Sequence, residues 1–143
     1  MPIESEILKP VIILMAWTMM MWLWMYLTRI PAMRAAKIDV VNLVGSTPSD
    51  LDKALPPQIQ WKAHNYNHLL DEPTIFYAVA IVLALIGQGD DVNAGIAWLY
   101  VALRIAHSLV QATVNRVAIR FLLFVSSSLC LIALILHAAI FVF

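Results

Sequence analysis

Four long stretches of this sequence carry almost no charge, and their lengths constrain the fold more than any other feature. Residues 11–28, 73–89 and 121–143 contain no Asp, Glu, Lys or Arg, and residues 92–115 contain only Arg104. A helix needs roughly 20 apolar residues to cross the ~30 Å hydrocarbon core of a bilayer. The apolar runs are continuous, whereas membrane strands alternate between apolar and polar residues. The sequence therefore predicts an all-α integral membrane protein, a bundle of four spanning helices.

The composition excludes several other classes of protein. Of the 143 residues, 62% are hydrophobic and 13% are charged, against about 45–50% and about 25% in soluble domains. A soluble monomer of this size cannot bury that much apolar surface in one core. Nine basic residues balance nine acidic ones, so no basic excess indicates nucleic acid as a partner. The single cysteine, Cys130, excludes an internal disulfide and a cysteine-rich metal site, and we expect no metal.

We expect one domain, residues 1–143, with helices at about 7–29, 58–87, 92–114 and 117–142 and a long connection at about 30–57. Pro73 is expected to kink the second helix where its polar first part becomes apolar. The first helix is interpreted as a retained membrane helix. Its leader holds Glu4 and Glu6 against a single lysine, which is the wrong charge for a signal peptide.

Basic residues mark two of the three connections. The first and third connections, or the helix ends beside them, hold Arg29, Arg34, Lys37, Lys53, Lys62, Arg116 and Arg120. The second connection holds Asp90 and Asp91 but neither lysine nor arginine. By the positive-inside rule, connections one and three face the cytoplasm and both termini face away from it.

Polar side chains interrupt the membrane helices in a regular pattern. On the second helix, spacings of three and four place His64, Asn67, His68 and Asp71 on one face. A similar stripe follows on the third helix and the start of the fourth: Arg104, His107, Ser108, Gln111, Asn115, Arg116 and Arg120. Ionisable groups in membrane helices normally face a bundle interior or a wet cavity. The two arrays predict one cationic, histidine-bearing pocket near the cytoplasmic interface that suits a carboxylate-bearing ligand.

Structural interpretations of the same residues remain open. Arg104 can pair with Asp71 or Glu72 to close the bundle, and His64 and His107 can be packing residues. Arg116 and Arg120 can serve only to set the topology. The serines at 126–128 favour close helix packing over a nucleophile, because no base stands beside them.

Two segments resemble the MAPEG family, the membrane-associated proteins of eicosanoid and glutathione metabolism. Arg104 is followed by His107 three residues on and by Arg116 and Arg120 twelve and sixteen on, a spacing that resembles the prostaglandin E synthase branch. The segment 62–76, Lys-Ala-His followed by asparagines, acidic residues, proline and phenylalanine, is similar to the family's second helix. Its run from Asn65 to Tyr77 looks more like a bacterial branch of the family.

The resemblance implies a homotrimer in a bacterial inner membrane that binds glutathione between subunits and is surrounded by lipid. It implies a glutathione-dependent transferase or peroxidase acting on a lipophilic electrophile that enters from the bilayer. In this interpretation Arg120 is the catalytic residue, because a close cation raises the thiolate fraction of glutathione. The glutathione-binding residues are then Arg104, His107, Arg116, Asn67, His64 and Arg34. The last of these is contributed by the adjacent subunit, and Arg29 is the alternative at that position, because the sequence does not distinguish the two arginines.

Departures from the family pattern keep a second interpretation open. Gln111, Phe121 and Phe124 stand where the family has a tyrosine, a serine and a tyrosine, and Leu70 stands at the expected glutamate. Those groups help to hold glutathione in the enzymes of the family. The alternative is a non-catalytic structural or accessory membrane subunit, or a lipid-binding member.

Overall fold

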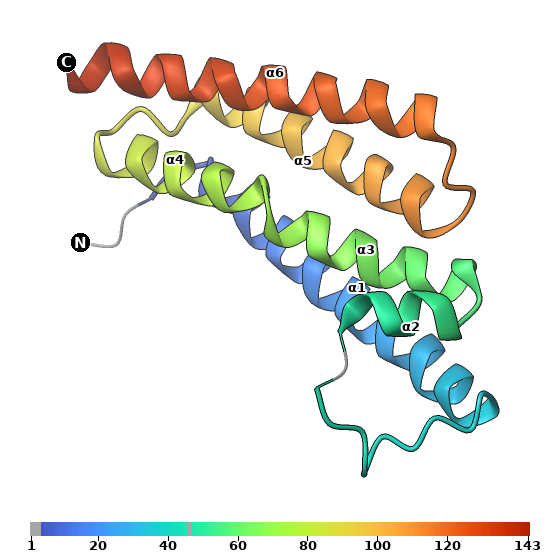
Figure 1. Ribbon diagram of the computed structural model, residues 1–143. Helices are drawn as coiled ribbons and strands as arrows, with labels where there is room; N and C mark the ends of the chain where they lie inside the picture. Colours follow the sequence, from blue (N-terminus) through green and yellow to red (C-terminus); the bar gives the residue numbers. More distant parts are fainter. Residues whose placement is uncertain (1–3, 46) are drawn as a thin grey trace.

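All regular secondary structure is helical, without a strand, in residues 4–45 and 47–143, which the computed structural model describes. The helices, shown in Figure 1, are α1 (Leu8–Ala35), α2 (Pro48–Ala54), α3 (Pro57–Leu70), α4 (Pro73–Leu85), α5 (Asp91–Ala112) and α6 (Val117–Val142). The all-α class predicted from the sequence is therefore confirmed.

Three helical segments are long and apolar enough to cross a membrane: α1, the stretch Pro57–Leu85 in which α4 directly follows α3, and α6. This finding supports an integral membrane protein. The sequence predicts a fourth span at about 92–114, and α5 occupies that segment with 22 residues. It is not among the three, because its buried face is polar and includes Arg104, His107 and Gln111.

Helix α1 is longer than the expected 7–29 and ends at Ala35, with Pro31 inside it. Proline has no backbone N–H to donate and therefore weakens a helix interior. The following Ala32, Met33 and Arg34 are strong helix formers, however, and they continue the helix for another turn.

Helix α2 lies within the segment for which the sequence predicts a loop. Thr47 and Asp50 form a capping box: the Thr47 N–H donates to Asp50 Oδ2 at 2.9 Å, and Pro48 occupies the first turn. A threonine followed three residues later by an acidic residue, with proline between them, is a recognised helix start. The signal for α2 is therefore present in the sequence.

The predicted kink at Pro73 is confirmed as a break between α3 and α4. Helix α3 ends at Leu70, and Pro73 is the first residue of α4. The prediction of one helix over 58–87 is corrected to two helices, because proline has no N–H to continue the hydrogen-bond ladder of α3.

Helix α5 lies at the centre of the packing. It contacts α6 along an antiparallel pair, and its other sides meet α1 and α3, while α4 packs on α6 and α1 on α3 and α4 (Figure 1). The fully buried apolar side chains include Leu14, Met21, Phe76, Leu83 and Leu134. This arrangement turns the polar stripe of α5 toward α1, α3 and α6, where the candidate site lies.

Candidate functional site

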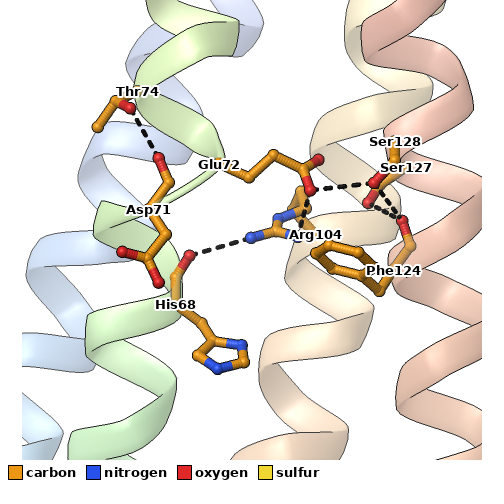
Figure 2. Close-up of polar contacts among 8 residues, drawn as sticks. All are labelled: His68, Asp71, Glu72, Thr74, Arg104, Phe124, Ser127 and Ser128. Atoms are coloured by element: carbon orange, nitrogen blue, oxygen red, sulfur yellow. Dashed lines mark hydrogen bonds and ion pairs between the residues drawn. The ribbon is translucent and has the colours of Figure 1, made fainter.

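Arg104 is the largest fully buried side chain, with 1% of its surface exposed. Its Nη2 donates a hydrogen bond to the backbone carbonyl of His68 at 3.0 Å, and its Nη1 lies 4.0 Å from Glu72 Oε2 (Figure 2). The last carbonyls of a helix lack intrahelical partners. Arg104 therefore satisfies a carbonyl at the end of α3 and stabilises the break between α3 and α4.

The side chains of Arg104 and Glu72 also contact α6. Ser128 Oγ donates to Glu72 Oε2 at 3.0 Å, and the Arg104 guanidinium lies over the Phe124 ring, 5.7 Å from its centroid (Figure 2). The pairing of Arg104 with Glu72, one of the two partners considered from the sequence, is present. These contacts join α5, α6 and the helix break into one polar interior.

A cavity of about 240 Å³ lies beside this group, between α3, α5 and α6. We call it the histidine–arginine cavity; its lining residues are His68, His107, Val117, Arg120, Phe121 and Phe124. The rings of His68 and His107 are stacked, with centroids 6.0 Å apart and planes inclined by 12°. Imidazoles and a guanidinium thus share a cavity with apolar walls.

Arg120 has no acidic partner among the residues that the structure describes. Its Nη1 donates to Asn115 Oδ1 at 2.6 Å, and its buried Nε has no hydrogen-bond partner. The positive charge is therefore compensated only by a neutral amide. Such a guanidinium is suited to bind an anion that enters the cavity.

A second cavity, of about 340 Å³, lies between α1, α2 and α3. We call it the α2 cavity; its lining residues are Met25, Arg29, Thr47, Leu51, Asp52, Ala63, His64, Tyr66 and Asn67. His64 Nε2 lies 3.1 Å from Asp52 Oδ1, and both side chains are exposed. The buried Nε of Arg29 has no partner. This cavity is larger than the first.

Buried amides and a hydroxyl join α1, α3 and α5. Ser108 Oγ accepts hydrogen bonds from Trp17 Nε1 at 2.9 Å and from Asn65 Nδ2 at 2.8 Å. Gln60 and Gln111 are also buried, and neither Oε1 atom has a partner. This polar interior fixes α3 against α5 and so fixes the width of the histidine–arginine cavity.

The structure distributes the predicted site residues over two cavities instead of one pocket. Arg120 and His107 line the histidine–arginine cavity, with Arg104 against its Phe124 wall. His64 and Asn67 line the α2 cavity. Arg34 and Arg116 are exposed and line neither cavity. Both cavities flank the same exposed face of α3.

His68 lines the first cavity and Asp52 the second, although neither was assigned to the binding site from the sequence. Arg29, the alternative to Arg34, also lines the second cavity. His68 follows His64 by one helical turn, so the spacing already placed it on the predicted polar face. No sequence pattern predicted Asp52 as a lining residue, because its position depends on how α2 packs against α3.

Comparison with protein-family models gives one finding. The model of the MAPEG family matches residues 7–140, nearly the whole chain. No curated protein and no solved structure matches the chain.

Proposed function

The chain belongs to the MAPEG family, and from this premise we propose that it is a glutathione-dependent transferase or peroxidase acting on lipophilic electrophiles. Family membership and the three apolar helices make it a membrane protein. The proposal concerns what its cavities bind and what chemistry they perform.

The observation that carries this proposal is the unpaired cation of Arg120 in a cavity with apolar walls. A nearby cation lowers the pKa of a thiol and so raises the fraction present as the nucleophilic thiolate. Apolar walls strengthen the electrostatic effect of the guanidinium, since they replace water with a medium of lower dielectric constant. Val117 and Phe121 are mostly exposed on α6, so a lipophilic compound can approach the cavity from the bilayer.

In the proposed conjugation, the thiolate sulfur of glutathione attacks an electrophilic carbon. A sulfur–carbon bond forms, and the electron pair of the broken bond moves to the leaving group. Arg120 stabilises the thiolate before attack, while His107 and His68 offer ring nitrogens on the opposite wall. Arg104 acts as a positioning residue, because it packs against Phe124 and holds the end of α3.

The remainder of the tripeptide is proposed to lie along the exposed face of α3. The histidine–arginine cavity, at about 240 Å³, is smaller than the ~300–1,000 Å³ typical of ligand pockets, so it suits one end of the ligand. His64 and Asn67 on the other flank of α3 then offer polar contacts to its carboxylates and amides. Arg34 and Arg116 join the site only if a neighbouring chain or a closed loop brings them to it.

We also propose a homotrimer in a bacterial inner membrane, with connections one and three in the cytoplasm. Native mass spectrometry of protein released from detergent tests the trimer by its mass. Single cysteines at the α1–α2 and α4–α5 connections, probed with a membrane-impermeant reagent in intact cells, test the orientation. Labelling of the α1–α2 connection from outside the cell contradicts it.

The glutathione proposal is tested by titration calorimetry and by conjugation assays on purified protein. Arg120→Ala is expected to lower turnover by about 10²-fold or more, the typical effect of losing a group that stabilises developing charge. Arg120→Lys should retain part of the turnover, because lysine keeps the positive charge but lacks the planar guanidinium of arginine. Lys53→Ala, which removes an exposed cation outside both cavities, is the matched control. Unchanged turnover in Arg120→Ala contradicts the mechanism.

A non-catalytic, lipid-binding member is the second candidate, favoured by one observation. Three of the six residues that line the histidine–arginine cavity are Val117, Phe121 and Phe124, and the position of a family tyrosine is Gln111, buried outside it. No heat with millimolar glutathione, together with stoichiometric lipid in the purified protein by mass spectrometry, supports this candidate over the enzyme.

A further inference from the structure

The connection between α1 and α2 exposes apolar side chains outside the spanning helices. Val40, Val41, Leu43 and Val44 are 58%, 92%, 48% and 94% exposed. We call these four residues the valine patch. An exposed apolar cluster of this kind marks an interaction surface, because water contact with it is unfavourable.

Local hydrogen bonds hold the polar groups of this loop inward. Lys37, which follows the end of α1, has a φ of 54°, and its N–H donates to the Arg34 carbonyl at 3.0 Å. This is the geometry of a left-handed helix cap. Asp39 Oδ2 accepts from Asn42 Nδ2 at 2.6 Å, and Oδ1 accepts from the N–H groups of Val41 and Asn42. The Asn42 amide, more than any other contact, holds the pKa of Asp39 below its ordinary value. The acid is thus turned toward the loop's own backbone.

The position of the loop along α1 places it at the membrane surface. Trp22 and Tyr26 are exposed near the end of the apolar part of α1, as is typical of the aromatic belt at an interface. Arg29 is the first charge after them, and Ala35 lies about 9 Å beyond it at 1.5 Å per residue. A bilayer has roughly 5–8 Å of headgroup region on each side of its core. The chain leaves α1 at the outer edge of that region.

From there the loop turns back alongside α1, toward its membrane-spanning part, on the side of α1 and α2 that faces away from α5 and α6 (Figure 1). Between loop and helix lies a mostly apolar hollow of about 250 Å³, lined by Ile38, Leu43, Val44, Gly45, Asp50, Leu51 and Ala54. The exposed cations Arg34 and Lys37 stand at the beginning of the loop. Cations beside an apolar surface complement the phosphate and hydrocarbon layers of a phospholipid.

We propose that the valine patch inserts into the headgroup–acyl boundary of the adjacent leaflet, with phospholipid as its partner. Hydrocarbon contacts the patch and the hollow beneath it, and the cations of Arg34 and Lys37 contact lipid phosphates. The loop thereby extends the apolar surface that α1 exposes to lipid, which includes Leu27 and Ile30. This inference does not depend on glutathione binding.

The test is fluorescence quenching in nanodiscs of phosphatidylethanolamine and phosphatidylglycerol, on a Cys130→Ala background. Val41→Cys and Val44→Cys carry an environment-sensitive dye, and Lys53→Cys on the exposed face of α2 is the matched control. Spin-labelled lipid is expected to quench the two patch positions several-fold more than position 53, and aqueous iodide several-fold less. Equal iodide quenching at all three positions overturns the proposal, since the patch then lies in water.

A second measurement avoids the substitutions. In the unlabelled protein, paramagnetic lipid is expected to broaden the methyl resonances of Val41 and Val44 more strongly than those of Val101, which is buried. Protection of the patch from both iodide and paramagnetic lipid overturns the proposal in favour of a second copy of the chain covering it.

Discussion

Arg104 and His64 each meet a carboxylate, but in opposite environments. Arg104 and Glu72 have side chains 1% and 16% exposed, whereas His64 and Asp52 are 47% and 41% exposed. Pairs removed from water are costly to break, because a single buried charge is left behind, while exposed pairs contribute little. The α5 side of α3 is therefore the rigid half of the candidate site, and the α2 side is the half that a ligand can rearrange.

The largest expected effect comes from the rigid half. Arg104→Ala should destabilise the protein by about 3–5 kcal/mol, because Glu72 stays poorly solvated without its cation and the His68 carbonyl loses a donor. The midpoint of thermal unfolding in detergent measures this effect. Arg116→Ala, which removes an exposed arginine, should change stability by no more than about 0.5 kcal/mol. Equal effects of the two variants contradict the assignment of Arg104 to a rigid, buried interior.

A smaller effect is expected at Ser108, also in the rigid half. Ser108→Ala leaves the buried donors of Trp17 and Asn65 without their acceptor, which typically costs about 1–3 kcal/mol. Ser126→Ala is the matched control, because its hydroxyl bonds only within its own helix, to the Leu122 carbonyl. Unfolding of the two variants in the same detergent gives the comparison. A neutral Ser108→Ala indicates that water replaces the hydroxyl.

On the α2 side, removing an ion pair should matter little. Asp52→Asn is expected to lower stability by about 0–1 kcal/mol, since both partners are exposed and screened by salt. Hydrogen exchange of the α2 amides should rise, while that of α5 stays unchanged. Faster hydrogen exchange of the α5 amides would contradict this expectation and show that the two halves of the site are coupled.

The smallest expected effect is a pH dependence of the start of α2. The backbone N–H and the hydroxyl of Thr47 hold the pKa of Asp50 below its ordinary value, which is about 3.9. A carboxyl group with a lowered pKa stabilises the helix above its unfolded-state pKa, and the contribution is lost as pH falls through the folded value. The NMR amide shifts of residues 48–54 should be constant from about pH 7 to 5 and move toward coil values below about 4. Asp50→Asn should remove that step.

Much of the fold was predictable because a membrane helix is marked by a continuous apolar run, which can be recognised without knowledge of distant residues. The prediction for α6, 117–142, matches its observed bounds, and the prediction for α5 differs by one or two residues. The end of α1 was not predictable from Pro31 alone, since helix-forming residues after a proline can continue the helix. Helix α2 carried a capping signal, but its position against α3 depends on packing.

The sequence by itself determined that this chain is an all-α membrane protein of the MAPEG family, and it placed α5 and α6 to within two residues. The tertiary structure decided which of its polar residues meet. His68 and His64 are one turn apart on α3, yet they line different cavities, and Arg104 reaches across to the end of α3. Spacing fixes only the face of a helix on which a side chain lies. What that face contacts depends on packing between helices distant in sequence.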